Sequence, residues 1–109
     1  ILSITLDEIK KYFLIDLNNL YLAFGPAIRL CCYEVGQDVA RFFYNQTFLK
    51  HNKIYLDLVE VNKNQAIKIG IRKENIFDSR ICTSCKHEEF YSYRKGDKVQ
   101  RTISLIMLR

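Results

Sequence analysis

DLVEVNKNQAIKIG, residues 57–70, is the clearest helical stretch of the chain. Asp57 and Glu60 form a box-like pair at its start, a pattern in which side-chain oxygens accept hydrogen bonds from the free N–H groups of the first turn. Gly70 suits the C-terminal cap. The apolar side chains of this stretch fall within one arc of a helix: Leu58, Val59, Val61, Ala66 and Ile69. The stretch therefore predicts a helix that buries one face against other elements.

Two further helices are predicted upstream. The run Thr5-Leu6-Asp7-Glu8 fits a capping box, which predicts a helix start at this point. Apolar residues then recur at helical spacing: Leu6, Ile9, Phe13 and Leu14. A second helix is predicted over Asp38 to Phe48, because Val39, Phe42 and Phe43 fall on one side of it.

Strands are predicted around these helices. Leu20 to Phe24 is a short apolar run that ends at Gly25-Pro26, as expected of a buried strand. Three later segments are rich in aromatic, β-branched or alternating apolar residues: Ile76 to Ile81, Phe90 to Tyr93 and Thr102 to Leu108. The run Lys95-Gly96-Asp97-Lys98 suits a turn between the last two. This order of elements indicates an α+β fold in which helices cover a sheet.

The composition is that of a globular protein. The chain has 109 residues, of which 49% are hydrophobic and only four are Gly and one is Pro, so one domain or a piece of one is expected. The longest nearly uncharged stretch, Leu17 to Ile28, is too short to cross a bilayer. The opening Ile1 to Phe13 carries four charged residues where a secretory signal needs an apolar run. We expect no membrane partner and a cytoplasmic location.

The net charge of +5 is concentrated towards the C-terminus, where residues 72–109 hold nine basic and five acidic side chains. A basic tail with aromatic residues can attract single-stranded nucleic acid, so a small nucleic-acid-binding module is one alternative. The basic residues alternate with Glu88, Glu89 and Asp97 instead of forming a run. This alternation favours a solvated face, and no nucleic-acid partner is expected.

The four cysteines form an adjacent pair, Cys31-Cys32, and a spaced pair, Cys82-Thr83-Ser84-Cys85. A structural zinc site built from Cys82, Cys85, His87 and one of the adjacent pair is an open alternative, although adjacent cysteines suit a shared tetrahedral ion poorly. A redox role for the spaced pair would require it to begin a helix. Reduced and mostly buried cysteines are the preferred interpretation.

No self-contained catalytic signature is present. The chain lacks G-x-S-x-G, H-E-x-x-H, G-x-x-x-x-G-K-[ST] and G-x-G-x-x-G. The segment Phe90-Tyr91-Ser92-Tyr93-Arg94 is chemically richer, because Arg94 could pair with a phosphate or carboxylate and a tyrosine ring could stack on a base. The alternative is an edge strand whose aromatic residues enter the core while Arg94 lies in solvent.

Three stretches together resemble one known family. They are, in order, Gly25-Pro26-Ala27-Ile28 leading into Cys31-Cys32-Tyr33-Glu34-Val35-Gly36, then Tyr55-Leu56-Asp57-Leu58, then Cys82-Thr83-Ser84-Cys85 followed by Phe90-Tyr91-Ser92-Tyr93-Arg94 and Arg101. The pattern is similar to the C-terminal half of the purine nucleoside phosphorylase family formerly called multicopper polyphenol oxidoreductase laccases, or laccase-domain proteins. The resemblance covers Leu20 to Leu108.

The resemblance implies that residues 1–109 are the C-terminal portion of a single domain about twice as long, with a layered α/β/β/α fold. It also implies phosphorolysis of purine nucleosides and deamination of adenosine, with zinc as cofactor and copper under the older label. The family's metal ligands, two histidines and a cysteine, lie in its N-terminal half in A-D-C and H-x-G-W-R-G segments. Neither segment is present here, so no metal ligand and no catalytic residue is assigned to this chain.

The expected partners are therefore a purine nucleoside, phosphate and the missing N-terminal half, without which the chain should be inactive. Within this half, Tyr93 and Arg94 are the predicted substrate-binding side chains, and the loop at Gly25 and Pro26 is predicted to allow close backbone approach. Two departures from the family pattern stand out. Arg29-Leu30 occupies a position where Gly-Pro is frequent, and Gln100 precedes Arg101 where Gly is usual.

Overall fold

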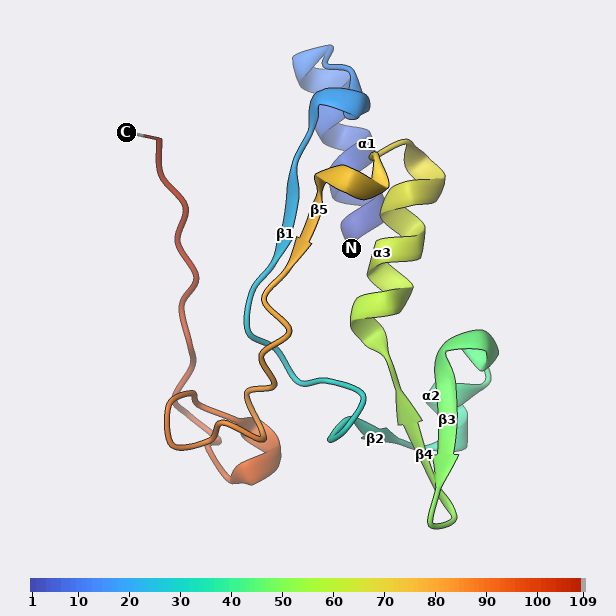
Figure 1. The fold of residues 1–109 in the computed structure, drawn as a ribbon, viewed down its shortest axis with the longest axis vertical. Coiled ribbons are helices and arrows are strands. Elements are labelled where there is room, and N and C mark those ends of the chain that lie inside the picture. The colour runs from blue at the N-terminus through green and yellow to red at the C-terminus, as the bar shows by residue number, and fades with distance from the viewer. Residues whose placement is uncertain (109) are drawn as a thin grey trace.

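The structure is a computed structural model that describes residues 1–108. Within these residues the helices and strands follow one another as α1 (Leu2–Phe13), β1 (Leu22–Phe24), β2 (Glu34–Val35), α2 (Gln37–Ala40), β3 (Thr47–Lys50), β4 (Lys53–Leu56), α3 (Leu58–Ile69) and β5 (Ile76–Asp78). Short 3-10 turns connect several of them. The mixed α and β architecture predicted from the sequence is confirmed (Figure 1).

The core lies where α1 and α3 pack together beside a parallel strand pair (Figure 1). Strand β1 pairs with β5 in parallel, with Leu22 opposite Ile76 and Phe24 opposite Asp78. Four buried side chains form the centre of the core: Leu6, Leu17, Ala66 and Ile71. Because β1 and β5 run in parallel, the loops that follow them leave the sheet at the same end.

The helix predicted over residues 57–70 is confirmed. The Asp57 carboxylate accepts a hydrogen bond from the N–H of Glu60 at 3.0 Å, so Asp57 is the N-cap of α3. Gly70 ends the helix with a φ of 131°, a conformation that favours glycine. Val59, Val61 and Ala66 are buried, as their shared arc predicts.

The capping box predicted at Thr5 is wrong. Helix α1 begins at Leu2, so Thr5 lies inside its first turns and its hydroxyl donates to the carbonyl of Ile1 at 3.1 Å. Because the helix already begins upstream of Thr5, the N–H groups that follow this residue are not the free ones of a first turn, and its side chain has none to cap. The periodicity of Leu6 and Ile9 identified the helix correctly but not its start.

The helix predicted over Asp38 to Phe48 is also wrong beyond its first turn. Helix α2 ends at Ala40, and β3 and β4 form an antiparallel hairpin with Thr47 opposite Leu56. His51 and Asn52, both at positive φ, make the tight connection, as the right-handed twist of a two-residue hairpin requires. Strand β2 joins the other edge of β4, which completes a three-stranded sheet of order β2-β4-β3.

Two of the three C-terminal strands are not formed as predicted. Residues 93–95 make a 3-10 turn instead of extending a strand from Phe90, because Asp97 accepts a hydrogen bond from the N–H of Ser92 at 2.7 Å and closes the chain on itself. Residues 102–108 run without regular structure along one side of the molecule (Figure 1). Strand β5 does form, but it ends at Asp78, ahead of Arg80 at a φ of 57°.

The molecule is extended for its size. Its radius of gyration is 15.7 Å, against about 13 Å for a compact domain of this length. Its solvent-accessible surface is 8664 Å², roughly a third more than the ~6,300 Å² of a folded monomer of this mass. Many large apolar side chains are exposed, including Tyr12, Phe13, Leu49, Ile103 and Leu105. No helix within residues 1–108 is long and apolar enough to cross a membrane.

Candidate functional site

The loops that follow β1 and β5 form the candidate site. Beyond the strands, the N–H of Ala27 donates to the carbonyl of Ile81 at 3.2 Å, and the N–H of Thr83 donates to the carbonyl of Ala27 at 3.1 Å. These bonds prolong the parallel pairing as an isolated bridge between Ala27 and Cys82. Segments more than 50 positions apart in sequence therefore lie side by side at the carboxyl end of the strand pair, a common place for sites in parallel sheets.

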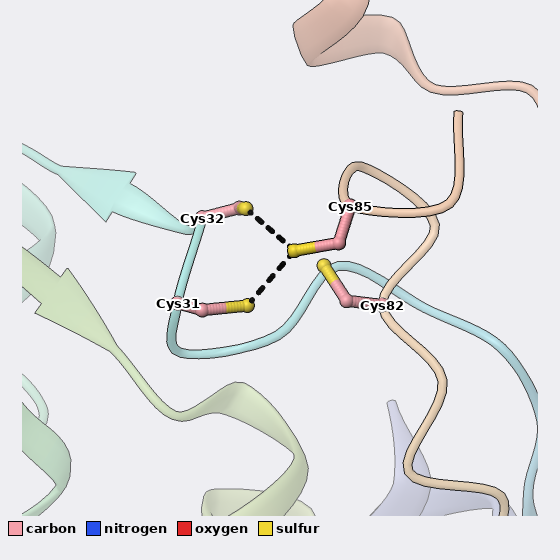
Figure 2. A group of neighbouring side chains, drawn as sticks. All are labelled: Cys31, Cys32, Cys82 and Cys85. Atoms are coloured by element: carbon pink, nitrogen blue, oxygen red, sulfur yellow. Dashed lines mark hydrogen bonds between the residues drawn. The ribbon is translucent and has the colours of Figure 1, made fainter. Parts of the chain in front are cut away.

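Four cysteine side chains converge between these loops (Figure 2). The Sγ atom of Cys85 lies 3.5 Å from that of Cys31 and 3.4 Å from that of Cys32. With Cys82 included, all four sulfur atoms lie within 4.8 Å of one another. Among residues 1–108, these cysteines are the one group of three or more His, Cys, Asp or Glu side chains that lie close enough together to hold a metal ion.

Two tight turns bring the cysteines together. The carbonyl of Arg29 accepts from the N–H groups of Cys32 and Tyr33, both at 2.9 Å, which curls the first loop so that Cys31 and Cys32 point toward Cys85 (Figure 2). The N–H of Lys86 donates to the carbonyl of Cys82 at 2.9 Å, which folds the spaced pair back in the same way. Neighbouring side chains of an extended chain point in opposite directions, so the turn at residues 29–33 is what lets adjacent cysteines converge.

The structure corrects the expectation that the cysteines are mostly buried and does not support the alternative ligand set that includes His87. Cys82 is buried, but Cys31 and Cys85 are exposed, so the cysteines are not mostly buried. His87 is not part of the group, because its Nε2 atom lies 2.9 Å from the Asp97 carboxylate. Both adjacent cysteines, rather than one of them with His87, take part in the cluster.

The surroundings of the cluster shift the pKa values of Cys82 and Cys31 in opposite directions. Burial raises the pKa of Cys82, but backbone hydrogen bonds from Cys85, Arg29 and Ser84 outweigh it and lower the pKa to about 6. Burial, together with hydrogen bonds from the other thiols, raises the pKa of Cys31 above its usual range. The sulfur of Cys82 is therefore predisposed to carry negative charge near neutral pH, while the raised pKa of Cys31 favours its protonated form.

The predicted substrate-binding residues Tyr93 and Arg94 border a separate hollow of about 260 Å³, together with Ile28, Tyr33 and Thr83. Arg94 donates from Nη1 to the carbonyl of Glu34 at 3.0 Å, and its guanidinium lies 5.3 Å from the centre of the Tyr33 ring. The structure therefore places Arg94 on the wall of a cavity instead of on the strand face expected from the sequence.

Gly25 and Pro26 do not border this hollow. They begin the same loop, at the end of β1, and the carbonyl of Gly25 accepts from Nη2 of Arg29 at 3.3 Å. A Cβ atom on Gly25 would lie 3.7 Å from the Ser104 hydroxyl, which is an ordinary contact distance. Gly25 thus lies beside the C-terminal segment of the chain, and close backbone approach to a substrate at Gly25 and Pro26 stays a prediction.

Arg29, one of the departures from the family pattern, is neutralised within the chain. Its guanidinium pairs with Asp78 at 2.6 Å, and Lys63 pairs with the same carboxylate at 2.9 Å. Burial would raise the pKa of Asp78, but hydrogen bonds from Arg29, the N–H of Arg80 and Lys63 hold it well below the usual 3.8. At the second departure, Arg101 donates to the carbonyls of Lys98 and Gln100 at 3.0 and 2.8 Å.

A family model described as multi-copper polyphenol oxidoreductase laccase matches residues 1–109. The chain belongs to this laccase-like family. The resemblance drawn from the sequence is thereby confirmed. The chain is 32% identical over 114 residues to a purine nucleoside phosphorylase of Bacteroides thetaiotaomicron, an alignment that covers 95% of this chain and 42% of that protein.

The chain is also similar to two other proteins. The adenosine deaminase RL5 from an unknown prokaryotic organism is 30% identical over 87 residues, covering 72% of this chain and 33% of that protein. The crystal structure of YlmD from Geobacillus stearothermophilus superimposes with a TM-score of 0.79 at 27% identity, covering 88% of this chain and 40% of that one. The chain thus spans about two fifths of the length of the relatives whose alignments cover most of it.

The two-histidine, one-cysteine ligand set implied by the sequence resemblance is not brought together among the described residues. His51 is exposed in the β3–β4 turn, and His87 pairs with Asp97. The four-cysteine cluster contains neither histidine. The part of the laccase-like domain described by residues 1–108 therefore does not itself fit the two-histidine, one-cysteine metal site that the sequence resemblance implies.

Proposed function

We propose that this chain is the C-terminal part of an enzyme that cleaves purine nucleosides with phosphate and also deaminates adenosine. The observation that carries the proposal is the alignment with a purine nucleoside phosphorylase over 95% of the chain. The similarity to an adenosine deaminase over 72% of the chain supports the second activity. A cytoplasmic location fits these substrates. It also fits four free thiols held close together, because thiols stay reduced there.

In this proposal, an N-terminal segment of the same polypeptide covers the exposed apolar surface. The excess of accessible surface over that of a compact monomer is on the order of 2,000 Å² or more, the size of an obligate interface. The relative from Bacteroides thetaiotaomicron has more than half of its length outside the aligned region. Residues 102–108, which carry exposed Ile103 and Leu105, would pair with a strand of that segment.

The catalytic zinc ion belongs to that N-terminal segment in the proposal, because residues 1–108 do not bring together the two-histidine, one-cysteine set that the resemblance implies. The contribution of this chain is the wall of the substrate cavity. Arg94 uses one guanidinium N–H on the carbonyl of Glu34, which leaves further donors for a phosphate oxygen. The rings of Tyr33 and Tyr93 border the same hollow and offer faces for a purine.

The reaction in this cavity is a displacement at the anomeric carbon of the ribose. A phosphate oxygen forms a bond to that carbon while the bond to the purine nitrogen breaks. The base leaves with the bonding electrons and takes up a proton, which yields the free purine and ribose 1-phosphate. Positive charge from Arg94 would hold the attacking phosphate in place.

The test is an assay of the complete polypeptide that contains this chain, with inosine or adenosine as substrate and with or without inorganic phosphate. Chromatography separates purine bases from nucleosides. Phosphorolysis gives hypoxanthine from inosine only when phosphate is present, whereas deamination gives inosine from adenosine regardless of phosphate. A polypeptide that does neither, with zinc supplied, contradicts the proposal.

A further inference from the structure

We propose that Cys31, Cys32, Cys82 and Cys85 together bind one zinc ion in a closed, four-thiolate structural site. Similar proteins are named for activities on nucleosides, and the resemblance drawn from the sequence implies a catalytic metal on other ligands. The proposed site is therefore additional to the proposed function and does not depend on it.

The spacing of the sulfur atoms fits a tetrahedral ion. Zinc binds thiolates at about 2.3 Å, so the sulfur atoms of a regular four-thiolate site lie about 3.8 Å apart. Cys85 Sγ lies 3.4 Å from Cys32 Sγ and 3.5 Å from Cys31 Sγ, and no pair in the cluster is farther apart than 4.8 Å. Side-chain rotations that move the sulfur atoms by up to about 1 Å convert this arrangement into a coordination shell.

The backbone holds this arrangement in place. The bridge between Ala27 and Cys82 continues the β1–β5 pairing into the site, and the turn closed on the carbonyl of Arg29 sets the direction of Cys31 and Cys32. The four ligands come from two loops that are far apart in sequence (Figure 2). An ion bound to all four would join these loops and leave no position for a substrate, which is the mark of a structural zinc site.

The competing chemistries fit the geometry less well. A disulfide would have to select one partner for Cys85, yet Cys31 and Cys32 lie almost equally near it. A redox-active pair at Cys82 and Cys85 would need a helix N-terminus, but residues 83–89 form turns. Four sulfur atoms that converge on one another can replace their protons with one shared cation, and thiolate ligands favour a thiophilic ion such as zinc.

The bound ion would also support the hollow next to it. Cys32 directly precedes Tyr33 and Glu34 in the sequence, and these two residues hold Arg94 through the ring contact and the carbonyl hydrogen bond. Fixing the loop at Cys32 therefore fixes the position of Arg94. This support is indirect, so we regard the cysteines as positioning residues.

The test compares zinc content between the complete polypeptide and its variants, purified without chelators and measured by mass spectrometry of the metal. Cys85→Ser removes the sulfur that lies nearest to both adjacent cysteines and should lower the content by one zinc ion per chain. The matched control His87→Asn removes a nearby metal-binding side chain outside the cluster and should leave the content unchanged. Cys85→His supplies another zinc ligand and should keep the ion.

A second measurement covers the case in which Cys85→Ser does not fold. Cobalt exchanged into the wild-type polypeptide should show sulfur-to-cobalt charge transfer of four-thiolate intensity, and Cys85→His should reduce that intensity. Unchanged zinc content in a folded Cys85→Ser variant overturns the proposal, as does iron in place of zinc or the absence of four-thiolate absorption. These readouts do not involve nucleoside turnover, so failure of the enzymatic proposal would leave them intact.

Discussion

The guanidinium of Arg29 lies 2.6 Å from the carboxylate of Asp78, and this ion pair joins the loop after β1 to the end of β5. Both side chains are only 12–13% exposed, and Lys63 reaches the same carboxylate from α3 at 2.9 Å. Three elements thus meet at Asp78, directly beside the loops that carry the cysteines. The contact explains how the chain accommodates an arginine at this point in the loop.

Replacing Asp78 with Asn should destabilise the complete polypeptide by about 2 kcal/mol, because it leaves Arg29 and Lys63 without their shared counter-charge in a shielded place. The free energy of unfolding in urea measures this. The matched control is Glu34→Gln, which breaks the exposed pair with Lys53 at 3.1 Å and should cost far less, because solvent screens this pair. Equal losses for the two variants would show that Asp78 has no special structural role.

The same carboxylate predicts a pH dependence. Because the folded-state pKa of Asp78 lies below the usual 3.8, its contribution to stability is fully present above that pH and is lost as the pH falls toward the folded-state value. Acid titration of the unfolding free energy should therefore show a steeper decline below pH 3.8 in the wild type than in Asp78→Asn. Parallel titration curves would contradict the assignment. Asp97, whose pKa is also lowered by its bonds to Ser92 and His87, is present in both proteins and cancels in the comparison.

The N-cap of α3 should matter more than the threonine near the start of α1. Asp57→Ala removes the acceptor of the Glu60 N–H and should cost about 1 kcal/mol. Thr5→Ala removes only a hydroxyl inside a helix, bonded to the Ile1 carbonyl, and alanine is the better helix former. Thermal unfolding of the two variants checks this order, and a larger loss for Thr5→Ala would restore the rejected capping box.

Arg94 should affect phosphate more than nucleoside. Arg94→Ala removes the guanidinium from the hollow it shares with Tyr33 and Tyr93, and we expect the KM for phosphate to rise at least tenfold, which corresponds to about 1.4 kcal/mol. Steady-state kinetics with varied phosphate measure this. Arg72→Ala, an exposed residue that does not border the hollow, is the control for loss of one positive charge. A KM for phosphate that stays within twofold of the wild type in Arg94→Ala would remove Arg94 from the proposed site.

Features that depend on neighbouring residues in the sequence could be predicted, whereas features that depend on pairing between distant segments could not. Helix α3 was identified in full because its cap, its apolar arc and Gly70 are all local signals. The hairpin at His51 and Asn52 was missed because the aromatic residues before it also fit a helical period, and pairing with β4 decides between the two. For residues 102–108, β-favouring composition alone made no strand, since a strand needs a neighbour to pair with.

The cysteine cluster also depends partly on local sequence and partly on long-range pairing. The residue types were visible in the sequence, but their convergence depends on the pairing of β1 with β5 and on the turn at residues 29–33. The one usable signal was the coincidence of an adjacent pair after the Gly25-Pro26 turn with a spaced pair after the second strand of the parallel pair. Only the fold shows that both follow neighbouring strand ends.

We propose that this chain completes its function only together with an N-terminal segment of a longer polypeptide. The most direct measurement is phosphate-dependent release of hypoxanthine from inosine by the complete polypeptide and, at equal concentration, by residues 1–109 alone. We expect turnover by the complete polypeptide and none above background by the isolated chain. Equal turnover by residues 1–109 alone, or no phosphate dependence in the complete polypeptide, would contradict it.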